Sequence, residues 1–110
     1  MRTLTSREGR QKTGYRVYTF ISSTLLTFDA HLIVYKQGSC IPKHVDGVEP
    51  GKRHYRLNIV LWDCKEGGRF RGESIFGSKR IIFFRPDIQE HSVTEVKKGT
   101  RLVLSFGKVL

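Results

Sequence analysis

Short hydrophobic runs, rich in β-branched and aromatic residues, alternate with turn-forming residues along the chain. The runs cover residues 15–21, 24–36, 40–45, 54–62, 70–76, 80–84, 90–96 and 101–106, and the breaks between them contain Gly38, 47–51, Gly67-Gly68, Gly77, Pro86-Asp87 and Gly99. No stretch of a dozen residues shows the period of an amphipathic helix. About eight short strands at intervals near ten residues predict an all-β domain with little or no helix, of the sandwich, jelly-roll or barrel type.

Two of the runs show which residues share a face of the predicted sheet. In 101–106, Leu102, Leu104 and Phe106 alternate with Arg101, Val103 and Ser105. In 55–61, Leu57, Ile59 and Leu61 alternate in the same way with Arg56, Asn58 and Val60. The mixed faces would line a polar interior, so the purely apolar faces would lie outside and need a cover. That cover must be the N-terminal segment or a second subunit.

The first fourteen residues carry four basic side chains and one acid, Glu8. This segment is expected to be either a basic arm or a strand-like cover for the sheet. Because the whole chain has 110 residues, it is interpreted as one domain, 1–110.

Composition restricts the class of protein further. Lys and Arg number 20 against 10 for Asp and Glu, so the formal net charge is +10 and anionic partners are favoured. No apolar run is long enough to span a membrane, and the polar start does not resemble a secretory signal. The two cysteines cannot form a disulfide framework. We therefore expect a cytoplasmic protein with free thiols and no membrane contact.

The residues with the strongest chemical signal are His44, Asp46, His91 and Arg101. His44 and Asp46 are two apart, so on a strand both side chains point to the same side and can share one metal ion. His91 opens a later run. Two histidines and one carboxylate that leave other coordination positions open suit non-haem Fe(II). Arg101 follows His91 by ten residues and could pair with a carboxylate in the same pocket.

From Tyr35 to Phe106 the chain resembles the double-stranded β-helix (cupin-like jelly-roll) core of the Fe(II)/2-oxoglutarate-dependent oxygenases, and among them the prolyl-hydroxylase-like branch. The resemblance rests on features that occur in the same order in both: Tyr35-Lys-Gln-Gly38, His44-Val-Asp46, Arg53 before the run 57–62, Gly67-Gly68-Arg-Phe70, the run 81–84, His91-Ser-Val93 and Gly99-Thr-Arg101. Relatives often have Tyr-Leu-Asn where this chain has Val60-Leu61-Trp62, so one hydroxyl that often contacts the cosubstrate is missing.

The resemblance implies a role for each matching residue. His44, Asp46 and His91 would bind Fe(II), and Arg101 would pair with the distal carboxylate of 2-oxoglutarate. Tyr35, Asn58 and Ser105 are further candidates for binding this cosubstrate, and Arg85 is a candidate substrate contact at the barrel mouth. His31 and His54 fit no ligand pattern.

The implied function is that of a dioxygenase which uses Fe(II), 2-oxoglutarate and molecular oxygen to hydroxylate a macromolecular substrate, either a protein side chain or a nucleobase. Asp46 argues for hydroxylation, because halogenating relatives replace this carboxylate with a small residue. The alternative is a non-catalytic, basic jelly-roll module that binds nucleic acid or a protein partner. The short chain and its uncovered apolar faces predict a homodimer.

Overall fold

The computed structural model describes residues 5–8, 14–23 and 25–110, and these residues form strands and loops without a helix. The strands are β1 (Thr5–Glu8), β2 (Arg16–Ser23), β3 (Phe28–Tyr35), β4 (Ile41–His44), β5 (His54–Trp62), β6 (Glu66–Gly67), β7 (Phe70–Gly72), β8 (Phe76–Gly77), β9 (Ile81–Phe84), β10 (His91–Val93), β11 (Val96–Lys98) and β12 (Arg101–Val109). No helix within the described ranges has the length and apolar character needed to cross a membrane.

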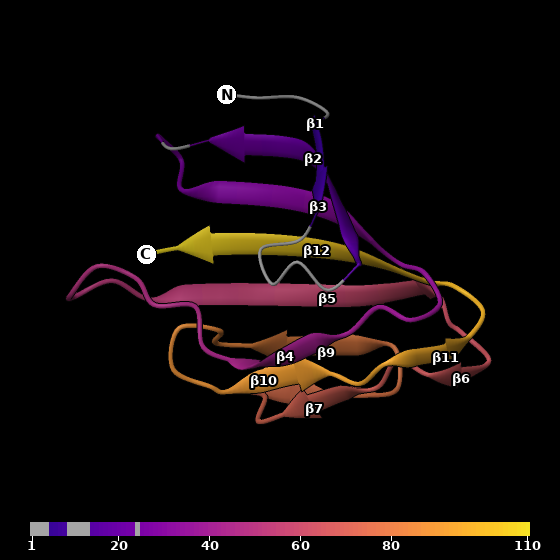
Figure 1. Cartoon of the computed structure of the whole chain (residues 1–110). Helices are drawn as coiled ribbons and strands as arrows, with labels where there is room; N and C mark the ends of the chain where they lie inside the picture. Colours follow the sequence, from indigo (N-terminus) through magenta and orange to yellow (C-terminus); the bar gives the residue numbers. More distant parts are fainter. Residues whose placement is uncertain (1–4, 9–13, 24) are drawn as a thin grey trace.

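The strands form one large sheet and two small ones (Figure 1). The large sheet has seven strands in the order β1-β2-β3-β12-β5-β9-β8, and the small sheets are β4-β10-β7 and β11-β6. The three-stranded sheet packs on the large one, because the ring of Phe84 in β9 lies 5.1 Å from Phe70 in β7 and 5.0 Å from His91 in β10. Two antiparallel sheets that enclose one core make the predicted all-β jelly roll.

The alternation predicted for β5 and β12 is confirmed by their register. Ser105 lies opposite Asn58, and Leu104 lies opposite Ile59. Arg101, Val103 and Ser105 are buried on the inner face, whereas the apolar residues between them are half-exposed on the outer face. The pairing shifts between Leu102 and Val103, and Leu61 is left without an opposite residue there. This bulge brings Trp62, rather than Leu61, opposite Leu102.

Several predicted runs are shorter or divided in the structure. The run 54–62 coincides with β5, but the part of 24–36 that precedes Phe28 is a turn at 25–27. The run 70–76 divides into β7 and β8, because Gly72, at φ +141°, passes against the carbonyl of Glu90 and the chain then leaves the small sheet for the large one. The run 90–96 divides into β10, which pairs with β4 and β7, and β11, which pairs with β6.

Part of the basic N-terminal segment is a strand. β1 pairs antiparallel with β2, and Thr5 lies opposite Thr19, so this part of 1–14 extends the edge of the large sheet. Residues 1–4 and 9–13 of that predicted segment lie outside the described residues.

The turn after β6 generates a stability prediction. Gly67 has φ +77°, and a Cβ there would lie 2.0 Å from the backbone carbonyl oxygen of Glu95, which cannot move without breaking the β6–β11 pair. Gly51 has a similar φ of +82°, but a Cβ there would meet nothing within 4 Å. Gly51→Ala should therefore lower the free energy of unfolding only by the cost of a left-handed backbone, about 1–2 kcal/mol. Gly67→Ala should lower it by roughly 3 kcal/mol or more. Urea unfolding of both variants measures the difference, and equal losses would contradict the role of the Glu95 contact.

Candidate metal and cosubstrate site

Two strand ends bring the predicted metal ligands together. His44 is the last residue of β4, and His91, the first residue of β10, lies directly opposite it in the antiparallel pair. Their ring centroids are 4.3 Å apart. Asp46 lies two residues beyond the end of β4, so a loop rather than a strand positions its carboxylate. The backbone N–H of Asp46 donates to the carbonyl of Pro86 at 2.7 Å and fixes this loop.

Both imidazoles are oriented in the same way by the backbone. Nδ1–H of His44 donates to the carbonyl of Pro42 at 2.7 Å, and Nδ1–H of His91 donates to the carbonyl of Gln89 at 2.9 Å. A carbonyl oxygen only accepts, so each Nδ1 carries the proton and each Nε2 of a neutral ring keeps a lone pair. This tautomer is the one that binds a metal through Nε2.

The two Nε2 atoms converge on the carboxylate of Asp46. Nε2 of His44 lies 3.4 Å from Oδ1, and Nε2 of His91 lies 3.6 Å from Oδ2. The three donor atoms all lie within 4.8 Å of one another, as the ligands of one ion do. The side chain of His91 is 9% exposed and that of Asp46 is 34% exposed, so the cluster opens to solvent on the Asp46 side.

Aromatic rings form the inner wall of this cluster. The ring of Phe70 stacks on His91 at 6.2 Å, and Phe84, which is 2% exposed, meets the same imidazole edge-on. These contacts restrict His91 to one orientation and exclude water from its inner side.

Arg101 lies in the interior without an anionic partner. It opens β12 opposite Tyr35, and its guanidinium carbon lies 5.3 Å from the centre of the Tyr35 ring. The residue is only 6% exposed, and no carboxylate of the described residues forms an ion pair with it. A buried cation is costly unless it is paired, and the face of one aromatic ring compensates only part of that cost.

Tyr35 forms the floor beneath Arg101. It is 2% exposed, and its ring stacks on Tyr15 at 5.7 Å. Burial raises the pKa of Tyr35 to about 12, although the charge of Arg101 acts in the opposite direction. The phenol is therefore protonated at neutral pH and can donate a hydrogen bond to an anion.

A pocket of about 340 Å³ leads to Arg101. Its lining includes Phe70, whose ring also stacks on His91, so one residue links the wall of the pocket to the cluster, although His44, Asp46 and His91 do not line the pocket. Basic side chains surround its opening, namely Arg69, Arg71 and Lys79, with one acid, Asp63. The space and its charge suit a small dicarboxylate.

A larger hollow, of about 420 Å³, lies on the other face of the three-stranded sheet. Lys43 and Ser92 line it, and they are the chain neighbours of His44 and His91. Because neighbouring side chains of a strand point to opposite faces, this hollow does not reach the ligand atoms.

Ser105 and Asn58 meet on the inner face, but they bond to each other. The hydroxyl of Ser105 donates to Oδ1 of Asn58 at 2.6 Å and accepts from Nη1 of Arg56 at 2.7 Å. Ser105 is fully buried. Their predicted contacts with the cosubstrate stay predictions. To make such contacts, Ser105 and Asn58 would have to give up the hydrogen bonds that they form here.

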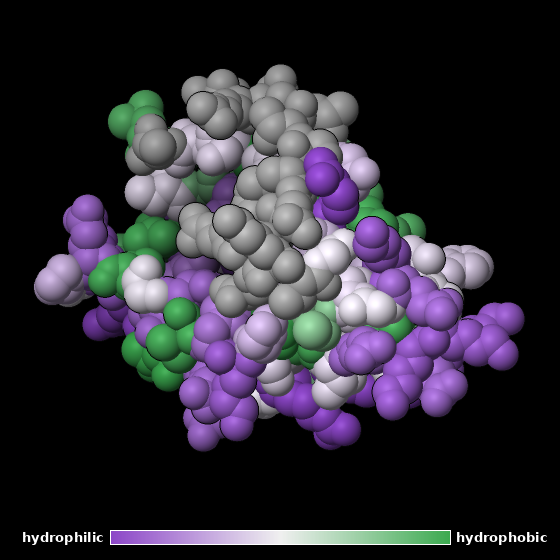
Figure 2. Space-filling model, in the orientation of Figure 1, coloured by the Kyte–Doolittle hydropathy of each residue, from purple (hydrophilic) through white to green (hydrophobic). Residues whose placement is uncertain are grey.

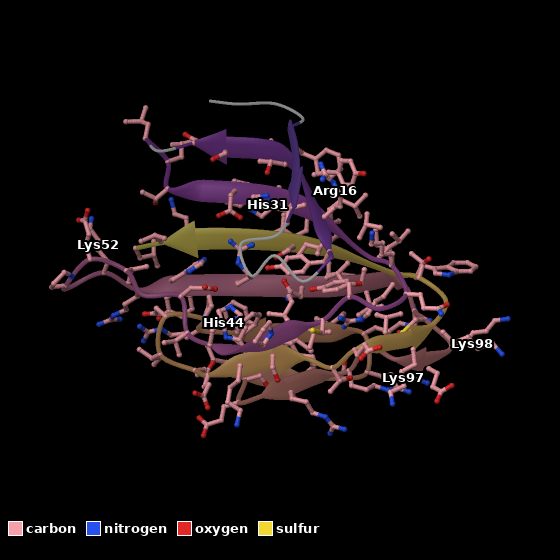
Figure 3. The ribbon with its side chains drawn as sticks, viewed as in Figure 1. Arg16, His31, His44, Lys52, Lys97 and Lys98 are labelled. Carbon is pink, nitrogen blue, oxygen red and sulfur yellow. The ribbon has the colours of Figure 1, made fainter. Side chains whose placement is uncertain are left out.

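A polar network that sequence analysis did not identify continues from Arg56. Nη2 of Arg56 donates to both oxygens of Asp29, at 2.7 and 2.9 Å, and Nε2 of His31 lies 3.0 Å from Oδ1. Thr19 completes the network, since its Oγ1 lies 3.0 Å from Nδ1 of His31. In Figure 3, His31 lies on the large sheet, away from His44 beside the small one. The alternation of Asp29 and His31 on one strand was the signal available in the sequence.

Arg85 is held within its own loop. Its Nε and Nη2 donate to the two oxygens of Asp87 at 3.2 and 2.5 Å, and its guanidinium lies over the ring of Tyr55 at 5.4 Å. Its predicted contact with substrate therefore stays a prediction.

The basic surface continues at the end of the molecule formed by β6 and β11. Figure 3 shows Lys97 and Lys98 there, and the surface in that region is mainly hydrophilic (Figure 2). The two cysteines, Cys40 and Cys64, are free and half-buried, and neither belongs to the metal cluster.

Comparison with known proteins shows the fold. No described protein family and no curated protein matches the sequence. Among solved structures, a cupin-2 domain protein from Rhodospirillum rubrum matches 96% of this chain and 69% of its own, with TM-score 0.63 and 11% identity. The collagen prolyl hydroxylase of Paramecium bursaria Chlorella virus-1, in complex with 2-oxoglutarate, matches 74% of this chain with TM-score 0.58 and 21% identity. This chain spans 59% of the viral enzyme.

A third similar structure contains SigE of Rhodobacter sphaeroides in complex with the anti-sigma factor ChrR, with TM-score 0.56 and 20% identity over 94% of this chain and 49% of that one. At these identities the three likenesses show a cupin-like jelly-roll fold, as the sequence predicted.

The Asp29 network generates a prediction on pH and stability. Burial alone would raise the pKa of Asp29, but the hydrogen bond from His31 and the charge of Arg56 outweigh it and lower the pKa from 3.8 to about 2. A lowered carboxyl pKa stabilises the fold above the unfolded value, and this contribution is lost as the pH falls from 3.8 towards 2. Asp29→Asn should reduce the loss of stability over that interval, measured as the urea midpoint at each pH. An unchanged pH profile would contradict the role of Asp29.

Proposed function

We propose that this protein is an Fe(II)/2-oxoglutarate-dependent dioxygenase that hydroxylates a macromolecular substrate. One observation carries the proposal: two imidazoles with free Nε2 atoms converge on one carboxylate, beside a pocket whose buried arginine has no anionic partner among the described residues. Each half of this arrangement occurs in many proteins, but together they provide for a metal ion and a dicarboxylate side by side.

The donor set fits Fe(II). Two nitrogens and one carboxylate oxygen occupy one side of an ion and leave open positions for a chelating cosubstrate and oxygen. A structural zinc site would close its coordination with a fourth protein ligand, commonly a thiolate. Neither Cys40 nor Cys64 belongs to the cluster, so the residues present favour the open site.

The pocket fits the distal carboxylate of 2-oxoglutarate. The planar guanidinium of Arg101 can hold a carboxylate in a bidentate pair, and the phenol of Tyr35, whose ring lies beneath the guanidinium, could donate a hydrogen bond to the same anion. The anion would neutralise the buried cation, so binding would remove the cost of leaving Arg101 unpaired. The 2-oxoglutarate complex of the viral prolyl hydroxylase supports this cosubstrate through a shared fold.

When bound, Fe(II), 2-oxoglutarate and oxygen supply the oxidising chemistry that inserts one oxygen atom into a C–H bond and releases succinate and carbon dioxide. The chain contributes position and shielding. His44, Asp46 and His91 would fix the reaction centre, Phe70 and Phe84 would exclude water from its inner side, and Arg101 would orient the cosubstrate.

The open side of the cluster supports a large substrate. Asp46 is one-third exposed, and neighbouring Val45 is 50% exposed, so a segment of a macromolecule could reach the reaction centre from solvent. The likeness to a collagen prolyl hydroxylase favours a protein side chain. The net charge of +10 favours an acidic protein segment or a nucleic acid.

A second candidate is a non-catalytic module that binds nucleic acid or a protein partner through its basic surface. The net charge and the likeness to a structure with an anti-sigma factor favour it. Turnover separates the two candidates. A dioxygenase converts 2-oxoglutarate to succinate, whereas a binding module leaves it unchanged.

The metal ligands generate the first test of this proposal. Anaerobic titration with Fe(II), followed by calorimetry, should show one ion per chain. His91→Ala should weaken binding by at least about a hundredfold, because loss of a ligand costs more than loss of a group that orients one. His54→Ala is the matched control, since His54 lies outside the cluster and bonds Arg56. Equal affinity of the two variants would contradict the assignment of His91.

Arg101 generates the second test. The anaerobic complex with Fe(II) and 2-oxoglutarate should show a weak visible charge-transfer band. Arg101→Ala should raise the concentration of 2-oxoglutarate needed for half of that band by roughly tenfold to hundredfold. Arg101→Lys should need a concentration of 2-oxoglutarate between those of the wild type and of Arg101→Ala, because lysine keeps the charge but cannot form the planar bidentate pair. Lys97→Ala, at an exposed position, is the control. If folded wild-type protein gives no band, the dioxygenase proposal fails.

A further inference from the structure

The outer face of the large sheet is apolar across six strands. Antiparallel partners share a face, so the register places the outward side chains in rows across the sheet. One row is Ile81, Ile59, Leu104, Leu32 and Tyr18, and the next is Phe76, Phe83, Leu57, Phe106, Ala30 and Ile21. The row on one side contains Trp62, Leu102, Val34 and Arg16, and the row on the other side contains Tyr55, Lys108, Phe28 and Ser23.

This face is not covered by the rest of the described chain. The three-stranded sheet packs on the opposite side through Phe84, and so does β11, whose Val96 belongs to the core with Val103. Most side chains of the outer rows consequently stay accessible, although Ala30 is only 5% exposed; Trp62 is 64%, Phe76 57% and Ile81 40% exposed. A contiguous apolar patch of this kind marks an interaction surface in soluble proteins.

The two central rows contain no charged residue, so charge offers an acidic partner no specific contact there. The rows are instead complementary to themselves. Leu104 is the middle residue of its row, on the middle strand of the sheet. A two-fold axis that lies in the interface along β12 would bring Leu104 against Leu104 of a second copy, Ile59 against Leu32, and Ile81 against Tyr18. Apolar residues would then meet apolar residues throughout the two central rows, whereas Lys108, in the outermost row on the same strand, would meet Lys108 of the second copy.

The size of the face is also sufficient. The 16 apolar residues of these rows, each taking about 4.8 Å by about 6.8 Å of the sheet, give a footprint of about 520 Å². Two such footprints bury about 1,000 Å², which reaches the lower limit for a specific interface. Two sheets packed about 10 Å apart form an ordinary β-sandwich.

We propose that the outer face of the large sheet binds a second copy of this chain, with Leu104 on the two-fold axis. The inference does not depend on the enzymatic proposal. Arg101 and Ser105 alternate with the interface residues and point inward, so both metal clusters would remain open.

Sedimentation equilibrium of the wild-type chain at micromolar concentration should give the mass of two chains. Because each copy carries a charge of +10, added salt should strengthen the dimer by screening repulsion. Leu104→Lys should abolish it, since two lysines would meet at the apolar centre of the interface, whereas the native Lys108 pair would lie towards its rim. The matched control is Leu25→Lys, at a turn residue that is 90% exposed and lies off this face, and it should stay dimeric. Circular dichroism confirms that each variant is folded.

The axis itself can be tested by mixing. Neither Leu104→Lys nor Leu104→Asp should form a dimer alone, but an equimolar mixture should form a one-to-one heterodimer, because residue 104 meets its own counterpart. The proposed packing is wrong if the wild type is monomeric or if Leu104→Lys is dimeric. It is also wrong if the mixture stays monomeric while the wild type is dimeric. If Leu104→Lys does not fold, Leu102→Lys, which lies on the same strand and therefore also on the axis, gives the same test.

Discussion

The position of β12 between β3 and β5 is the constraint on which the rest of the structure depends. This strand has hydrogen-bonded neighbours on both sides along most of its length, so its register cannot slip without reversing both faces of the sheet. Because of this register, Arg101 faces Tyr35 inside the molecule while Leu104 faces solvent. The inward position of Arg101 and the apolar outer face are thus two results of one alternation.

The alternation and the pairing of His44 with Asp46 could be predicted from the sequence because both depend on local spacing, whereas His91 was assigned to the same site by its place in the family resemblance. β5 was located at its true bounds, and His44, Asp46 and His91 were found to converge. The divided strands were not predictable, since only the partners available in space decide where β7 ends and β8 begins. The network around Asp29 was missed for the same reason: Arg56 reaches it only because β12 inserts between β3 and β5.

A small domain with so many interior polar groups must satisfy each of them. Asp29 and Arg56 form an ion pair with further bonds to His31 and Ser105, and no buried polar side-chain atom of the described residues lacks a partner. Gly107 makes this possible, because a Cβ there would lie 2.1 Å from Nη2 of Arg56. Arg101 differs from this network, since an aromatic ring is its partner and no acid among the described residues neutralises it. The interior therefore has one charged region, around Asp29, that the chain itself neutralises. It has another, around Arg101, that an anion could neutralise.

Both imidazoles of the metal cluster are oriented by main-chain carbonyls two residues upstream, at Pro42 and Gln89. In many metal sites this role belongs to a carboxylate side chain, which a single mutation can remove or exchange. A carbonyl oxygen is present whatever side chain its residue carries. The tautomer of each histidine is thus determined by the path of the backbone, and the side chains around the cluster can change without altering the orientation of the two Nε2 atoms.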